Sequence, residues 1–201
     1  MRHTSLEFLN VSGNNLPNYD AVVSILENNK HIKHMNVRGT PMTVDNLGYV
    51  WLGLRQNISL IELEFQREKV AFAFDTLQCV EIDLILNQEI NEVILPRVEG
   101  SHLKNHPQLE LNDTKIQNIE SVLKYIRLTK TVKSLDISYT NMSMRPVQKL
   151  TRALCTREIH LSTLILSRNL QITDEVCKVL AHLFRERSTI KHLYLDDTSI
   201  T

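Results

Sequence analysis

Residues 132–142 read VKSLDISYTNM, with apolar side chains at Val132, Leu135, Ile137 and Met142 and a hydroxyl at Thr140. Leu135 and Ile137 alternate with polar neighbours, and a period of two is typical of a short strand that buries one face. The hydroxyl of Thr140 stands where that strand must end, and it can bond backbone groups of a turn. The stretch therefore predicts a short strand followed by a tight polar turn.

Internal repetition of this frame is the strongest signal in the sequence. The frame starts again near residues 6, 32, 60, 90, 106, 161 and 190, mostly 26 to 30 residues apart. An amide or a hydroxyl fills the turn position in six copies: Asn14, Thr40, Thr114, Thr140, Asn169 and Thr198. One unit of this size cannot bury its apolar face alone, so we expect the copies to stack side by side.

A helix is expected between successive strands, because apolar residues recur three and four positions apart in most of the second halves. Residues suited to the cap or first turn of a helix precede five of these segments: Asp20, Thr43 or Asp45, Asn118, Pro146, and Thr173 or Asp174. Strands lie about 4.8 Å apart whereas packed helices need about 8–10 Å, so stacking predicts an arc with the strands on its concave side.

The repeated frame resembles the leucine-rich repeat family, and its spacing and helical second halves are similar to the ribonuclease-inhibitor-like subtype. The resemblance covers almost the whole chain, residues 1–201. It implies an α/β leucine-rich-repeat solenoid of about eight repeats in a single domain, with a curved parallel sheet on the concave side and helices on the convex side. Neither end shows a cap, so we expect a segment of a longer array whose ends are covered by further repeats or by assembly neighbours.

The fourth copy departs from the frame. Its expected strand, Ile90–Leu95, is followed at once by Pro96, which cannot donate a hydrogen bond to a strand ladder. Only 16 residues separate the start of this copy from the next start at His106. We therefore expect an irregular loop over residues 96–107 in place of a helix. Such a loop is either a tolerated deletion or a protruding partner-binding element.

Composition and motifs exclude several classes of function. The chain has 23 Lys plus Arg and 23 Asp plus Glu, so it lacks an overall basic field for nucleic acid or an anionic membrane. It contains no phosphate-binding glycine loop, G-x-S-x-G, H-E-x-x-H or C-x-x-C motif. Cys79, Cys155 and Cys177 form no close-spaced pair, which favours a reduced, cytoplasmic setting, with cytoskeletal association as one option. We expect no enzyme activity, catalytic residue, metal or cofactor.

The strand positions between the buried residues form the expected binding surface. They point away from the helices, and their carboxylates make the strip acidic, which favours a partner with a basic patch. Exposed apolar side chains would anchor that partner. The predicted partner-binding residues are Phe8, His34, Arg38, Glu62, Glu64, Glu92, Ile94, Glu110, Asp136, Tyr139, Ile165 and Tyr194.

These expectations favour a non-enzymatic scaffold that binds a protein through its concave strand face and binds neither nucleic acid nor a membrane. Three alternatives stay open: a regulator of an enzyme, of the GTPase-activating or inhibitor type; a structural subunit of a large cytoskeletal, axonemal or other assembly; and a bacterial effector. Repeat arrays offer an extended, rigid surface rather than an enclosed pocket, which favours the scaffold.

Overall fold

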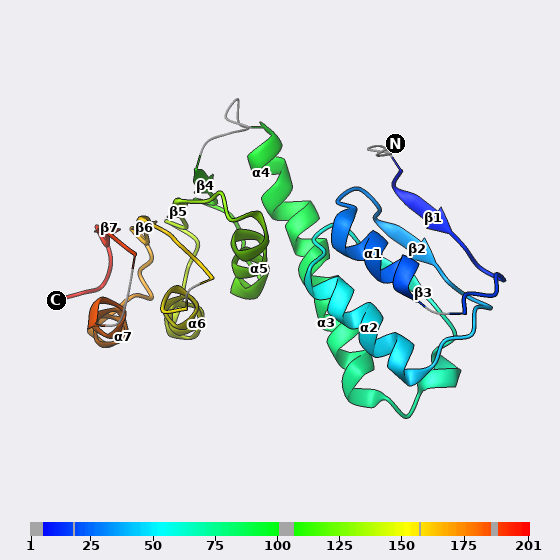
Figure 1. Ribbon diagram of the computed structural model, residues 1–201. Helices are drawn as coiled ribbons and strands as arrows, with labels where there is room; N and C mark the ends of the chain where they lie inside the picture. Colours follow the sequence, from blue (N-terminus) through cyan, green and yellow to red (C-terminus); the bar gives the residue numbers. More distant parts are fainter. Residues whose placement is uncertain (1–5, 18, 101–106, 157, 186–188) are drawn as a thin grey trace. The chain divides into compact units, whose positions relative to one another are not determined.

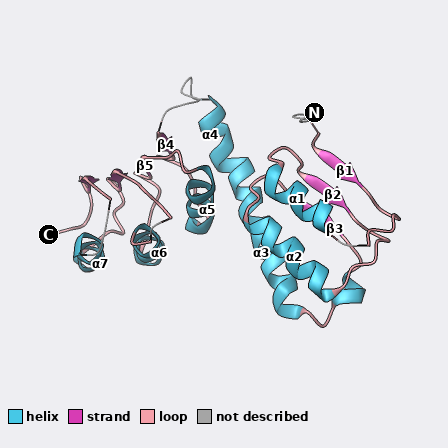
Figure 2. Ribbon diagram, in the orientation of Figure 1, coloured by secondary structure: helices cyan, strands magenta, loops and turns pink. Residues whose placement is uncertain are grey.

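The computed structural model describes residues 6–17, 19–100, 107–156, 158–185 and 189–201 (Figure 1). Strands and helices alternate along this α/β chain and form two parallel sheets, of three and four strands (Figure 2). The chain divides into two compact units, Met1–Asn91 (unit 1) and Glu92–Thr201 (unit 2). The strand-helix alternation predicted by the repeated frame is thus present in both units.

Unit 1 contains a sheet of three parallel strands with helices on one face. The strands are, in sheet order, β1 (Phe8–Asn10), β2 (His34–Asn36) and β3 (Glu62–Glu64). The helices are α1 (Asp20–Asn28), α2 (Val44–Arg55) and α3 (Phe74–Glu89), with a short 3-10 helix, η1 (Arg67–Val70), before α3. Thr43 caps α2 as expected, because its side chain accepts the Asn46 N–H at 3.2 Å.

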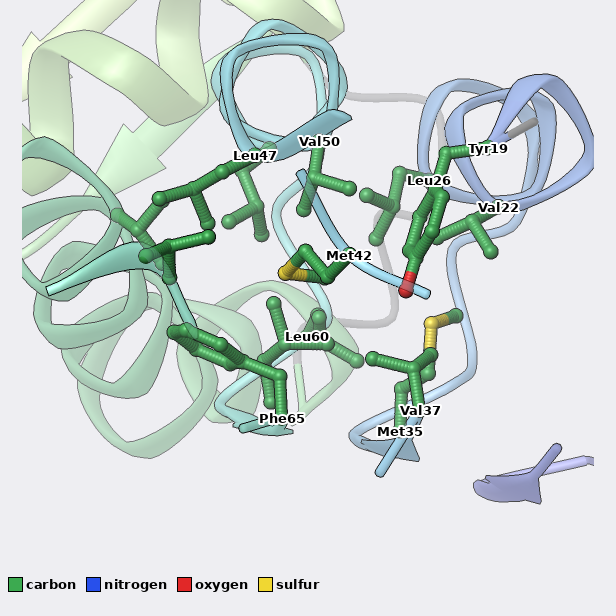
Figure 3. Close-up of a cluster of buried hydrophobic side chains, with 14 of the residues drawn as sticks. Tyr19, Val22, Leu26, Met35, Val37, Met42, Leu47, Val50, Leu60 and Phe65 are labelled. Carbon is green, nitrogen blue, oxygen red and sulfur yellow. The ribbon is translucent and has the colours of Figure 1, made fainter. Parts of the chain in front are cut away.

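The core of unit 1 fills the space between the sheet and the helices, as Figure 3 shows. Met35 of β2 and Leu47 and Val50 of α2 are all buried there, as the frame and the helical period predict. The buried hydroxyl of Tyr19 shares a hydrogen bond with Thr40. Burial raises the pKa of Tyr19 above its usual value, and the hydrogen bond to Thr40 partly offsets this effect.

The buried Asn57 connects successive coils of unit 1 where a helix gives way to the next strand. The Nδ2 of Asn57 donates to the carbonyls of Leu26 and Asn29, at 2.8 and 3.0 Å. Its Oδ1 accepts the N–H groups of Ser59 and Leu60, at 2.9 and 2.7 Å. The Oδ1 of Asn29 accepts two backbone N–H groups of its own turn in the same way. One side chain thereby satisfies backbone groups that the helix end leaves open.

The strand expected at Ile90–Leu95 is wrong, because this stretch is helical. Five residues of π-helical geometry, η2 (Ile90–Ile94), continue α3, and α4 (Leu95–Gly100) follows. The buried positions recur every three or four residues, which is a helical period: Val80, Asp83, Asn87, Ile90 and Ile94. In a fourth strand Glu92 would have faced Glu62 of β3, and like charges directly opposite one another destabilise a sheet.

The irregular loop expected over residues 96–107 is wrong in its first part, because Pro96 lies inside α4; residues 101–106 lie outside the described residues. A proline inside a helix removes one hydrogen bond and crowds the preceding turn, and the π-helical turn before Pro96 accommodates this. The continued helix also affects Asn87, whose buried Oδ1 has no hydrogen-bond partner among the described residues. Asn29 and Asn57 each accept the N–H groups two and three residues after them. After Asn87 the equivalent N–H groups belong to the helix and bond its carbonyls instead.

Unit 2 repeats the same architecture with a sheet of four parallel strands. The strands are, in sheet order, β4 (Gln108–Glu110), β5 (Ser134–Asp136), β6 (Thr163–Ile165) and β7 (His192–Tyr194). The helices α5 (Ile119–Thr129), α6 (Met144–Leu154) and α7 (Asp174–Arg185) lie on one side of this sheet (Figure 1). The frame leucines Leu109, Leu135 and Leu164 are buried, which confirms the predicted inward positions.

The polar turn position of the frame has the role that the sequence predicts. The Nδ2 of Asn169 donates to the carbonyls of Ile137 and Leu166, at 2.9 and 2.8 Å, and its Oδ1 accepts the N–H groups of Thr140 and Met142, at 3.1 and 2.8 Å. Asn169 thus joins its own turn to that of the preceding coil. Threonine hydroxyls donate to the carbonyl three residues earlier at Thr40, Thr140 and Thr198.

Candidate functional site

The strand positions predicted to bind a partner form rows of side chains in register within each sheet. In unit 1 the first row joins Phe8, His34 and Glu62 across the three strands. The rings of Phe8 and His34 lie 6.5 Å apart, and His34 Nδ1 is 2.8 Å from Glu62 Oε2. Phe8 is 53% exposed, so this row presents an aromatic ring beside a hydrogen-bonded imidazole and carboxylate.

The second row of unit 1 is also internally paired. Asn36 Nδ2 donates to Glu64 Oε2 at 3.2 Å, and Arg38 Nε lies 3.7 Å from the same oxygen. The two carboxylates of β3, Glu62 and Glu64, therefore each have a donor or a cation on the neighbouring strand. The acidic strip predicted from the sequence is largely compensated in unit 1.

The carboxylates of unit 2 have no such compensation. Glu110 of β4 lies directly opposite Asp136 of β5, and the row continues through Ile165 to Tyr194. The Oδ1 of Asp136 accepts the Ser138 N–H at 2.9 Å. Neither carboxylate forms an ion pair within the described part of the chain. The two neighbouring carboxylates make this the most acidic part of the strand face, and the exposed Tyr194 lies in the same row beyond Ile165.

A further row lies in the turns just after the strands, and of its members only Tyr139 was predicted as a site residue. Six coils have a left-handed backbone at the same frame position: Gly13, Gly39, Asp113, Tyr139, Arg168 and Asp197. The coil of β3 has η1 there instead. Glycine adopts this conformation readily, whereas a side chain adds strain of about 1–2 kcal/mol. The signal that could have revealed the row is the pair of glycines at one frame position in the first two coils.

Tyr139 is the bulkiest member of this row. Its φ is 55°, and 63% of its side chain is exposed. Its neighbour Arg168 is exposed as well, and Arg168 Nε lies 3.5 Å from Asp197 Oδ2. Leu170, which follows in the same turn, is 69% exposed. The row therefore presents aromatic, cationic and apolar groups at the end of the strands, and these are residue types that dominate protein interfaces.

Two predicted site residues do not lie on the strand face, and their assignment to it is wrong. Glu92 lies on η2 as an exposed residue, and Ile94 is 1% exposed in the same helical turn. Both assignments depended on the strand expected at Ile90–Leu95. The other ten predicted residues lie on the strands or in the turns that follow them.

The described residues contain no group of three or more His, Cys, Asp or Glu side chains arranged to hold a metal ion. No helix in the described part of the chain has the length and apolar character needed to cross a membrane. Comparison with known protein families and with curated proteins finds no family and no protein that matches this chain.

Proposed function

We propose that this chain is a non-enzymatic protein-interaction scaffold that binds a partner with a basic patch through its strand face. The observation that carries the proposal is the facing pair Glu110 and Asp136, set in register beside Ile165 and the exposed Tyr194. A pair of uncompensated carboxylates destabilises its own sheet, and a lysine or arginine of a partner would relieve that repulsion.

The proposal includes the stacking of the coils within each unit in the manner of a leucine-rich-repeat solenoid. The same frame, the same left-handed turn position and the same parallel register occur in both units, which supports this proposal. Within a unit, each regular coil would add one strand to the sheet and one helix to the layer beside it. Each sheet then presents its strand residues as one surface.

Backbone strain at Tyr139 provides independent support for binding at this end of the strands. Strained residues persist where the surrounding structure enforces them, and they cluster at binding and functional sites. A glycine would relieve the strain at Tyr139 at no loss of core packing, since most of the side chain is in solvent. A solvent-exposed tyrosine at a position of this kind is suited to act as an anchor for a partner.

The test compares proteins captured by the wild type and by a Glu110→Lys, Asp136→Lys variant, with circular dichroism to confirm that the variant folds. We expect the variant to lose a specific basic partner, with affinity reduced by at least about tenfold for two reversed charges. The control is Glu175→Lys, a single charge reversal at an exposed position of α7, to be compared with Glu110→Lys and Asp136→Lys each made alone. Equal capture of the same partner by the double variant and the control would refute binding through the strand face.

A second variant tests whether Glu92 belongs to the binding face. Glu92→Lys carries the same charge change on a residue that the sequence placed in the acidic strip and the structure places on η2. We expect it to leave capture of the partner unchanged. Loss of capture in this variant alone would mean that the partner contacts the helical side.

A further inference from the structure

The sheet of unit 1 has an open edge at β3. Val11 N–H donates to Asn36 O and Val37 N–H donates to Glu64 O, at 2.9 and 2.8 Å, so the chain at the end of each strand donates a backbone hydrogen bond to the next strand. In the same register the N–H of Phe65 and the backbone groups of Leu63 point away from β2, because alternate residues of a parallel strand bond to opposite sides. In the described part of unit 1 no strand follows β3.

A hollow of about 410 Å³ lies against this edge. Its lining includes Glu62 and Glu64, which point out from the sheet, and also Leu63 and Phe65, which point into the core. Both faces of a single strand can line the same hollow only at the strand's edge. Leu84 of α3 adds an apolar wall on the core side. The hollow therefore provides space for a side chain beside the unpaired backbone.

The helix that follows β3 covers only the entry to this edge. Asn87 Nδ2 donates to Leu60 O and Asn91 Nδ2 donates to Ile58 O, at 2.8 and 2.9 Å. Both carbonyls precede the strand. Among the described residues no comparable side chain binds the backbone of Leu63 or Phe65. The open groups thus coincide with the hollow.

The carboxylates at this edge indicate which side chains a bound segment should carry. Glu62 and Glu64 each use Oε2 towards β2, where His34 and Asn36 lie 2.8 and 3.2 Å away. A carboxylate can accept further hydrogen bonds through its second oxygen. The lining holds a third carboxylate, Glu68, and two arginines. Arg38 Nε lies 3.7 Å from Glu64 Oε2, and Arg67 Nη1 lies 2.6 Å from Glu81 Oε1. Glu68 and the second oxygens of Glu62 and Glu64 therefore favour cationic side chains at this edge.

We propose that β3 accepts an extended segment of another protein as a fourth parallel strand, with Lys or Arg opposite Glu62 and Glu64 and an apolar residue opposite Leu63. The apolar side chain enters the hollow towards Leu84, and the two cations lie on the strand face. The chain's own fourth copy does not have this pattern, because its frame would place Glu92 opposite Glu62. This site lies beyond the strand-face contact proposed above and is independent of it.

The probe is a fluorescein-labelled peptide with the core Thr-Lys-Val-Lys-Thr, titrated against the full chain, with amide exchange read at Leu63 and Phe65. We expect binding to slow exchange of both amides at least tenfold. Because the lysine amides face β3 in a parallel strand, N-methylation of the two lysines abolishes binding. N-methylation of the valine, whose amide faces away, preserves it and is the matched control. Glu62→Gln with Glu64→Gln weakens binding roughly tenfold, since two cross-strand charge pairs are lost.

Three results would overturn the proposal. Equal binding of both N-methylated peptides would show attraction by charge alone. Slow exchange of Leu63 and Phe65 in the free protein would show that another strand of this chain, or a second copy, already occupies the edge. Absence of peptide binding at concentrations up to the millimolar range would show that the hollow has no such ligand. None of these results affects the test at Glu110 and Asp136, so a failure here is distinct from a failure of the strand face.

Discussion

The two units use one repeated frame with two different surface chemistries. In unit 1 the left-handed turn positions are Gly13 and Gly39, which adopt that backbone without strain. In unit 2 the same positions carry Asp113, Tyr139 and Arg168, among others, and each adds strain. The frame determines the backbone in both cases, so the difference lies only in what the turns present to solvent.

The strand faces of the two units also differ, in how far their carboxylates are compensated by neighbouring donors or cations. Glu64 of unit 1 lies beside Asn36 and Arg38, whereas Glu110 of unit 2 lies opposite another carboxylate, Asp136. Unit 1 thus has compensated charges and relaxed turns, and unit 2 has uncompensated charges and strained turns. Features that reduce folding stability without serving the core are expected where a partner binds, which is why unit 2 is the better candidate for the main contact.

The largest expected effect concerns the polar turn position. Asn169 is fully buried and its side chain bonds five backbone groups in two coils, so Asn169→Ala leaves these groups without this partner and lowers the free energy of unfolding by about 3 kcal/mol or more. Asn14 has the same frame position in unit 1 but is exposed, and within the described part of the chain its side chain bonds Val11 O and Ser12 O of its own turn. Asn14→Ala should cost less than about 1 kcal/mol. Urea unfolding of both variants measures the comparison, and equal losses would contradict it.

Sequence periodicity predicted the strands, the register and most of the helices, because each follows from local spacing and burial. Residues at equal positions of the frame, such as Gln108 and Ser134 or Glu110 and Asp136, are the pairs that the structure forms. The role of Asn169 in its own turn was also predictable, since an amide at that position can bond a carbonyl of the turn. Its bonds to the preceding coil were not predicted. The predicted features depend on few residues at short range.

The fourth copy shows where this reasoning fails. Ile90–Leu95 fits the strand frame, but Ile90 and Ile94 also continue the helical period of α3, and two periods in one segment cannot be separated by spacing alone. The repulsion between Glu92 and Glu62 in a strand depends on pairing across the sheet, which is a tertiary property. The hollow at β3 was equally unpredictable, because it exists only where the next strand does not form.

A smaller effect distinguishes the turns of the two units. Gly39→Ala adds a Cβ at φ 71°, within 3.2 Å of Gly13 N, and should destabilise the protein by about 1–2 kcal/mol. Tyr139→Gly at the equivalent position of unit 2 should instead stabilise it by roughly 0.5–1 kcal/mol, because strain is removed and no core contact is lost. Thermal unfolding should show a lower midpoint temperature for Gly39→Ala and a higher one for Tyr139→Gly. Partner capture by Tyr139→Gly should fall at the same time, and a variant that is more stable with full capture would exclude Tyr139 as an anchor.

The smallest effect concerns the charges of the strand face. Glu64→Gln in unit 1 removes an ion pair with Arg38 and should destabilise the protein by a few tenths of a kcal/mol, about the value of an exposed pair. Glu110→Gln in unit 2 removes a repulsion with Asp136 and should stabilise it by about 0.2–1 kcal/mol. Salt screens both interactions, so high salt should reduce both the loss of unfolding free energy in Glu64→Gln and the gain in Glu110→Gln. Unfolding curves at low and high salt test this, and two changes of the same sign would mean that the carboxylates of the two units are in equivalent environments.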